Sequence, residues 1–142
     1  MLNKLRFGVF LPFYAFGAEK GKPSSYFDSI RDVVLECERL GYHSVWLDDH
    51  LMSGKRSILE CWTTLSALSS ITAKIRLGTM VLCNSFREPS LLAKMAATLD
   101  VISNGRLEFG IGAGVQENEH TAYGMPFPKP SVRIDRMKRL WK

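Results

Sequence analysis

The sequence predicts an α/β fold in which short parallel strands alternate with amphipathic helices. Four segments are short and largely apolar, as expected for strands covered on both faces of a parallel sheet. They are residues 6–11, 44–47, 75–81 and 106–111. Helical patterns separate them at regular spacing, which favours a parallel sheet with right-handed crossovers. Two closures are compatible with this pattern: a small doubly wound sheet, or part of an eight-stranded barrel, which typically needs about 250 residues.

The first strand and helix are readable from residues 6–41. Residues 6–11 (RFGVFL) end at Pro12, and a loop rich in glycine, lysine and serine follows. Ser24 or Ser25 can cap the next helix, and Gly41 is placed to end it. Between them, four apolar side chains recur at three- and four-residue spacing, which predicts one buried face. These are Phe27, Ile30, Val34 and Cys37.

The second unit contains the first group of candidate functional residues. Residues 44–47 (SVWL) are the strand, and Asp48, Asp49 and His50 stand at its carboxyl end. Apolar side chains then repeat at three-residue steps from Leu59 to Ile71, which predicts a second helix that leads into the third strand.

Residues 75–114 make one complete strand, helix and strand unit. Pro89 is well placed as an early helical residue, and Asn104-Gly105 ends the helix sharply. The buried stripe of this helix is Leu92, Met95, Leu99 and Ile102. Small and polar residues follow both strands: Thr79, Cys83 and Asn84 after one, Gly112, Ala113 and Gly114 after the other. Because ligands of α/β folds bind just beyond the carboxyl ends of parallel strands, this edge is the predicted site.

The last part of the chain is polar and then basic. Pro126, Pro128 and Pro130 forbid a regular helix, and a helical pattern resumes over 133–142. The formal charge of +5 resides in residues 129–142, while the preceding residues balance their charges. A basic helix could contact an anionic partner, but we expect a solvated helix face rather than a nucleic-acid surface.

Composition and length indicate an ordinary globular domain over residues 1–142. No apolar run approaches the roughly 20 residues of a membrane span, and no targeting segment precedes the first strand, so a cytoplasmic protein is expected. Cys37, Cys61 and Cys83 are widely spaced, with no pattern typical of zinc or a redox pair. They are expected to be reduced thiols, and no metal site is predicted.

Three segments together resemble the bacterial luciferase-like monooxygenases, especially the branch assigned to the deazaflavin coenzyme F-420 (F420). The segments are SVWLDDHL, the 75–114 unit, and ENEHTAYGMPFP. The resemblance covers nearly the whole chain. It implies a (β/α)8 TIM barrel that binds coenzyme F-420 or FMN at the carboxyl ends of its strands and performs hydride transfer or flavin-dependent oxygenation. On this comparison the chain is the N-terminal half-barrel with only the first four βα units.

The resemblance also implies roles for individual residues. His50 is the candidate catalytic residue, with Asp49 beside it at the cofactor; an imidazole can give or take a proton near neutral pH. Without the resemblance, Asp49 and His50 could be an ordinary surface pair. Asp48 is expected to be structural. At Val115 some deazaflavin dehydrogenases carry a glutamate proposed as general acid, a role that valine cannot perform.

The remaining candidate cofactor contacts lie around the third and fourth strands. Met80-Val81 matches a bulge that carries a non-prolyl cis peptide against the cofactor ring; the alternative is a regular strand. The other matched positions are Thr79, Cys83, Asn84, Gly112 and Asn118, with Glu119 as a loop anchor. Cys83 could equally be a small buried filler. The glycines after the fourth strand are spaced GxGxG, unlike the dinucleotide fingerprint GxGxxG.

Two functions follow as hypotheses. The first is a flavin- or deazaflavin-dependent oxidoreductase, whose site is incomplete in a single copy because the phosphate usually binds after the seventh and eighth strands of a barrel. The second is an inactive half-barrel that at most binds a flavin. A half-barrel leaves edge strands unpaired, so a homodimer formed through those edges is expected in either case. The sequence does not identify a small-molecule substrate.

Overall fold

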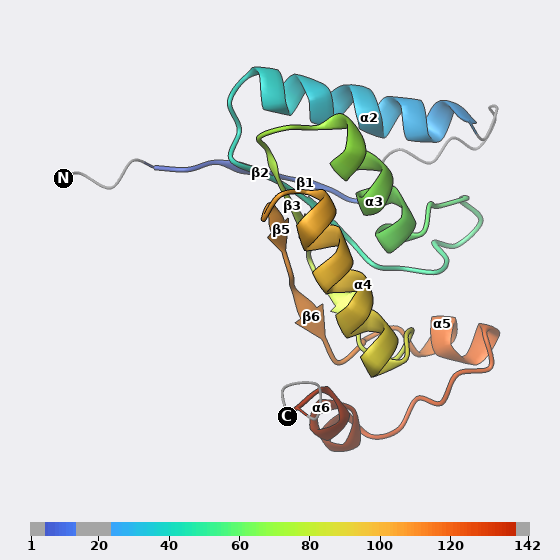
Figure 1. Ribbon diagram of the computed structural model, residues 1–142. Coiled ribbons are helices and arrows are strands. Elements are labelled where there is room, and N and C mark those ends of the chain that lie inside the picture. Colours follow the sequence, from blue (N-terminus) through green and yellow to red (C-terminus); the bar gives the residue numbers. More distant parts are fainter. Residues whose placement is uncertain (1–4, 14–23, 139–142) are drawn as a thin grey trace.

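The computed structural model describes residues 5–13 and 24–138, and its elements alternate as expected (Figure 1). The strands are β1 (Gly8–Leu11), β2 (Ser44–Leu47), β3 (Arg76–Thr79), β4 (Leu82–Cys83), β5 (Leu107–Glu108) and β6 (Ile111–Gly112). The helices are α2 (Ser24–Arg39), α3 (Cys61–Ile71), α4 (Pro89–Ile102), α5 (Glu117–Ala122) and α6 (Pro130–Lys138). The predicted α/β class is confirmed, and the expected loop at 17–24 lies mostly outside the described residues.

All strand pairings are parallel. The main sheet has the order β1-β2-β3-β5, and β4 pairs with β6 in a second, two-stranded sheet. The register places Leu47 beside Thr79 and Leu77 beside Leu107. Strands of the main sheet lie side by side in the same order as in the sequence, and helices connect them. This is the arrangement found in the wall of a (β/α) barrel. A doubly wound sheet would reverse its strand order, so the barrel alternative is the one observed.

The third and fourth strands differ from the prediction because each is interrupted. The expected strand 75–81 is divided into β3 and β4, and the expected strand 106–111 into β5 and β6. Between the halves, Thr79 Oγ1 donates to the Gly110 carbonyl at 2.7 Å and accepts from Gly110 N at 3.0 Å. The Thr79 side chain therefore replaces the backbone hydrogen bonds that would otherwise join the two strands at this point.

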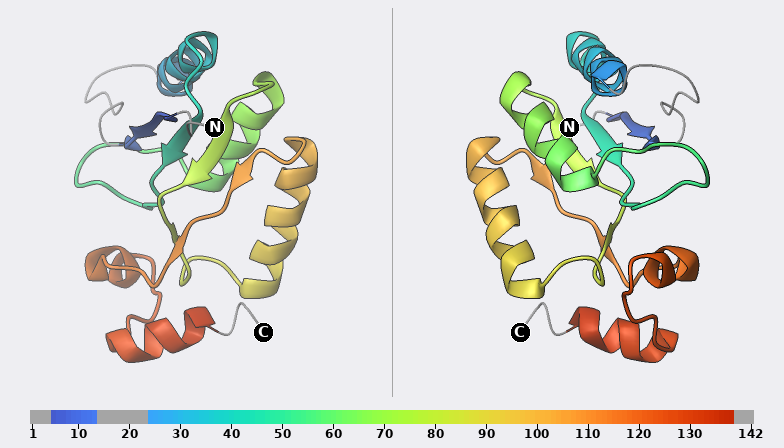
Figure 2. Two further views of the ribbon diagram at one scale, coloured as in Figure 1. Left: turned by 90° about the vertical axis from the view of Figure 1, so that its left-hand side faces the viewer. Right: turned by 90° about the vertical axis from the view of Figure 1, so that its right-hand side faces the viewer.

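Helices α2, α3 and α4 lie on one side of the main sheet, whereas α5 and α6 gather beyond the ends of β4 and β6 (Figure 2). The core lies between the sheet and the three covering helices. Its fully buried members include Val34 of α2, Val45 and Leu47 of β2, and Leu65 and Leu68 of α3. Alternate strand residues point into this layer, as the two-residue period of a strand requires.

Helix ends are set by local chemistry. The Glu60 carboxylate accepts from the backbone N–H groups of Trp62 and Thr63 at the start of α3. Glu88 does the same for α4, ahead of Pro89 in its first turn. The final helix was expected over 133–142, but α6 begins at Pro130, because a proline fits the first helical position as well as it breaks an interior. The short helix α5 was not predicted from its polar stretch.

The other face of the main sheet has no covering helix among the described elements. The Trp46 indole lies across it, and its Nε1 donates to Ser44 Oγ at 2.9 Å. A Cβ atom on Gly78 would lie 2.3 Å from that ring, so only glycine fits beneath it. Phe10 on the same face remains 40% exposed. No helix in the described part of the chain is long and apolar enough to cross a membrane.

Candidate functional site

A cavity of about 330 Å³ opens at the carboxyl edge of the strands. Its walls come from the segment after β2, from the β3–β4 connection with β4, and from the segment that joins β6 to α5. The lining residues are Asp48, Asp49, His50, Met80, Val81, Leu82, Cys83, Phe86, Gly112, Ala113, Gly114, Val115, Gln116, Glu119 and His120. The cavity therefore lies at the edge that the sequence predicted.

The apolar floor of the cavity is the break between β3 and β4. The Met80–Val81 peptide is cis, which confirms the expected bulge. Met80 and Val81 are 46% and 48% exposed, unusually open for large apolar side chains that border a cavity. A Cβ atom on Gly112 would lie 2.7 Å from Val81 Cγ2, so glycine there lets β6 approach the bulge closely.

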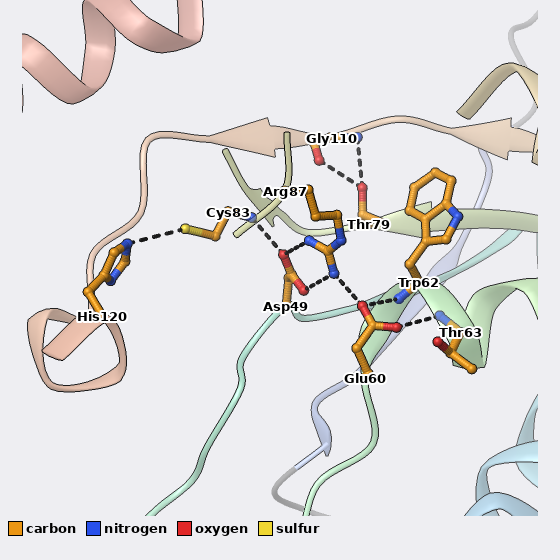
Figure 3. Close-up of polar contacts among 9 residues, drawn as sticks. All are labelled: Asp49, Glu60, Trp62, Thr63, Thr79, Cys83, Arg87, Gly110 and His120. Atoms are coloured by element: carbon orange, nitrogen blue, oxygen red, sulfur yellow. Dashed lines mark hydrogen bonds and ion pairs between the residues drawn. The ribbon is translucent and has the colours of Figure 1, made fainter. Parts of the chain in front are cut away.

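Asp49 is held in a buried ionic network (Figure 3). Its carboxylate accepts from Cys83 N at 2.8 Å and from both terminal nitrogens of Arg87, at 2.6 and 2.8 Å. Arg87 also pairs with Glu60, the cap of α3. Burial disfavours the charged guanidinium, but Asp49 and Glu60 outweigh it and raise the pKa of Arg87. Asp49 thus links the end of β2 to β4, and Arg87 extends this link to the start of α3.

His50 is oriented by a carboxylate that is distant in the sequence. Its Nδ1 donates to Glu119 Oε1 at 2.9 Å, and the Glu119 side chain is only 3% exposed. A carboxylate on Nδ1 leaves Nε2 as the nitrogen that can exchange a proton with a ligand. Glu119, which the resemblance implied as a loop anchor, lies in α5 and holds His50. Asp48, expected to be structural, accepts from Phe13 N at 2.9 Å.

The opposite wall carries a thiol and a second imidazole. Cys83 Sγ lies 3.9 Å from Nε2 of His120, which is completely buried (Figure 3). The sequence did not single out His120. Its only sequence signal was its position next to Glu119, in a helix of six residues that is too short to show a period.

The predicted site residues divide into two groups. Six of the nine border the cavity: Asp49, His50, Met80, Val81, Cys83 and Gly112. Three do not. Thr79 is fully buried and bonded to Gly110, and Asn118 is exposed on α5. Asn84 lies in a neighbouring cleft, where its Oδ1 has no hydrogen-bond partner among the described residues.

The arrangement suits a flat, largely apolar ring with a few polar edges. Met80 and Val81 offer an open apolar surface, and His50 and Cys83 offer groups that can exchange protons or hydrogen bonds. Cavities of this kind, with few and well-oriented polar groups, are typical of cofactor sites. A flavin-type ring fits these residues. Within the described residues no group of three or more histidine, cysteine or acidic side chains could hold a metal ion.

Comparison with known proteins gives a consistent set of relatives. The sequence profile of the family described as luciferase-like monooxygenase matches residues 5–141. The chain is 34% identical over 144 residues to an F420-dependent glucose-6-phosphate dehydrogenase of Microbacterium testaceum, covering 97% of this chain and 39% of the relative. It is 32% identical over 141 residues to the enzyme of that name in Kineococcus radiotolerans, covering 90% and 40%.

Solved structures agree with these relatives. Monooxygenase RslO1 from Streptomyces bottropensis superposes with a TM-score of 0.82 at 24% identity, covering 96% of this chain and 42% of that one, and shows the shared fold. An F420-dependent secondary alcohol dehydrogenase, in complex with an F420-acetone adduct, gives 0.74 at 27% identity, covering 97% and 40%. The chain spans about two fifths of the length of the curated relatives that it matches.

Proposed function

The chain belongs to the luciferase-like monooxygenase family, and on that premise we propose that it forms one wall of the cofactor site of an F420- or FMN-dependent oxidoreductase. Residues 1–142 would be the first four βα units of the (β/α)8 barrel. The relatives that support this proposal are named as F420-dependent enzymes, and one structural neighbour is described as a complex with FMN. When bound, the ring supplies two-electron chemistry, either hydride transfer or oxygenation.

One observation carries the proposal: an exposed apolar surface and an oriented imidazole border the same cavity. Met80 and Val81 would support the face of the ring, and Gly112 would let it approach the backbone. These contacts would exclude water from one side of the ring, which strengthens polar interactions at the site.

His50 would be the proton-handling residue. Glu119 holds Nδ1, so Nε2 is the nitrogen that can exchange a proton with a reacting atom. It donates when the imidazole is protonated and accepts when the imidazole is neutral. Asp49 cannot share this role while Arg87 and Cys83 N occupy its oxygens. Val115 is 77% exposed and carries no ionisable group, so it cannot act as the general acid that the resemblance suggests for this position in some deazaflavin dehydrogenases.

The proposal is tested by titrating the purified chain with F420 and with FMN, separately, and following the visible absorbance of each. We expect saturable binding of at least one of them. Val81→Asp places a charge on the proposed ring face and should weaken that binding at least tenfold, since an unpaired charge against an apolar surface is costly. Val101→Asp is the matched control, because Val101 is an exposed valine of α4 outside the cavity.

Two outcomes would reject the oxidoreductase proposal. One is the absence of saturable binding by a folded chain, which favours the inactive half-barrel. The other is an equal effect of the two aspartate substitutions, because a specific ring site at Val81 requires them to differ.

Self-association is a second proposal, supported by the two unpaired edges of the main sheet. Strands β1 and β5 are its two edges, and each has only one strand partner among the described residues. Phe7 and Phe10 lie exposed at or beside the β1 edge. Unpaired edges of this kind favour strand pairing with another chain. Light scattering should report a dimer at micromolar concentration, and a monomer at every concentration would contradict the proposal.

A further inference from the structure

The cavity contains a thiol and an imidazole whose relation does not depend on any cofactor. Cys83 comes from β4 and His120 from α5, and Sγ and Nε2 lie 3.9 Å apart. Both side chains border the cavity, and Gly114 closes over them: a Cβ atom there would lie 2.8 Å from Cys83 Sγ. Distances between a nucleophile and its base are often this long in the absence of substrate.

The hydrogen bonds of His120 determine which of its nitrogens can act as a base. Nδ1 lies 2.7 Å from the Gln116 carbonyl, which can only accept, so Nδ1 carries the proton. In the neutral ring Nε2 is therefore unprotonated, and it is the nitrogen that approaches Cys83 Sγ. The ring is held between Phe86 and Phe127, with centroids 5.1 and 4.7 Å away.

Burial, with help from nearby carboxylates, favours the neutral form of the Cys83 thiol. Burial is the main cause that raises the pKa of Cys83, and the carboxylates of Asp49 and Glu119 add to it, although hydrogen bonds from Ser85 oppose them. A neutral thiol in this setting needs a base at the moment of attack.

We propose that Cys83 and His120 form a nucleophile–base pair that adds to small α,β-unsaturated carbonyl compounds in the cavity. His120 Nε2 takes the thiol proton as the sulfur forms a bond with the β-carbon of the ligand. The π electrons of the carbon–carbon double bond move toward the carbonyl as an enolate. His120 then returns the proton to the α-carbon. The addition consumes no oxidant, reductant or further reactant.

The chemistry of the cavity favours this ligand class. A sulfur nucleophile prefers a polarisable carbon electrophile, and the apolar side chains of Met80, Val81 and Phe86 suit an uncharged ligand. Cys37 and Cys61 provide the internal comparison. Both are buried, and neither has an imidazole within hydrogen-bond distance among the described residues. Burial raises the pKa of the Cys61 thiol as well.

The experiment follows alkylation of the purified chain by acrylamide, a small α,β-unsaturated amide, at pH 7, with peptide mass spectrometry to resolve the three cysteines. We expect Cys83 to react at least tenfold faster than Cys61. His120→Phe should lower the Cys83 rate at least tenfold, because phenylalanine preserves the packing between Phe86 and Phe127 and removes the base. His43→Phe, an imidazole replacement at the opposite end of the sheet, should leave the rate unchanged.

The pH dependence of the unaltered chain gives a second test that needs no variant. A base-assisted reaction stops rising with pH once its base is neutral, whereas an unassisted thiol reacts tenfold faster per pH unit up to its pKa. A Cys83 rate that climbs without levelling off, or that equals the Cys61 rate, would overturn the proposal. The assay contains no F420 or FMN, so failure of ring binding and failure of this pair are separate results.

Discussion

The two ends of the sheet both contain buried charged side chains, but they use them differently. At the amino end the buried Arg106 and the half-buried Glu38 bind mainly backbone groups. At the carboxyl end Asp49 pairs with Arg87 and His50 with Glu119, and Asp49, His50 and Glu119 border a cavity. Buried charge alone is therefore no sign of a functional site. What distinguishes the carboxyl end is charge beside open space, as the barrel architecture predicts.

At the amino end of the sheet, Arg106 and Glu38 form many hydrogen bonds with the backbone. The Arg106 guanidinium donates to the carbonyls of Ser69, Thr72, Ile75 and Ser103 and to Thr72 Oγ1. Glu38 Oε1 accepts from three successive N–H groups, those of Ala73, Lys74 and Ile75. These bonds satisfy the end of α3 and the start of β3, which would otherwise leave backbone groups unpaired. Their role is stability.

Replacing Arg106 should have the largest effect on stability. Arg106→Ala leaves several buried carbonyls without donors, and we expect a loss of about 3–5 kcal/mol in the free energy of unfolding. Urea denaturation followed by circular dichroism measures it. Arg39→Ala, which removes an exposed pair with Glu36, should cost less than about 1 kcal/mol. Similar losses for the two variants would contradict a special role for the amino-end network.

Asp49→Asn tests the carboxyl-end network and comes next in size. The change removes the charge that faces Arg87 and one acceptor for its two nitrogens, and we expect a loss of about 2–3 kcal/mol. Unlike Arg106→Ala, it should also weaken ring binding in the absorbance titration, because Asp49 positions Cys83 N in the cavity wall. Unchanged ring binding by a folded Asp49→Asn chain would show that Asp49 contributes to stability alone, as Arg106 does.

Glu38 links stability at the amino end to pH. Burial opposes ionisation of Glu38, but the three backbone N–H donors and Arg106 hold its pKa below the ordinary 4.5. A lowered folded-state pKa adds stability that is present above the ordinary value and is lost as the pH falls through the lowered one. Denaturation at a series of pH values should show this loss. Glu38→Gln should remove that part of the pH dependence and cost about 1–2 kcal/mol at pH 7.

Glu119→Gln should have the smallest effect on stability and still affect the site. The glutamine oxygen can accept from His50 Nδ1, so packing is preserved and we expect a change of less than about 1 kcal/mol. Ring binding should weaken several-fold, because the charge that orients His50 is gone. The same titration and denaturation experiments check both values, and a variant that binds the ring normally would show that Glu119 is only a loop anchor.

Much of this comparison could be anticipated from the sequence, but not all of it. The strand at 44–47 and the helix after Pro89 were predicted from short-range patterns, and so was the edge at which the site lies. The cis peptide at Met80–Val81 was implied by family resemblance. Thr79, which is expected at the cofactor, bridges the interrupted strands, because its side chain faces Gly110 across a gap in the ladder.

The sequence by itself determined the alternation of strands and helices and the family, because both depend on residues within one segment or motif. Only the tertiary structure decided which side chains meet. His50 and Glu119 are 69 positions apart, and Cys83 and His120 are 37 apart. Local propensity acts over a few residues, whereas these distances depend on the register of β4 with β6 and on where α5 packs. Some of the site residues could therefore be predicted from the sequence, whereas the side chains that they contact could not.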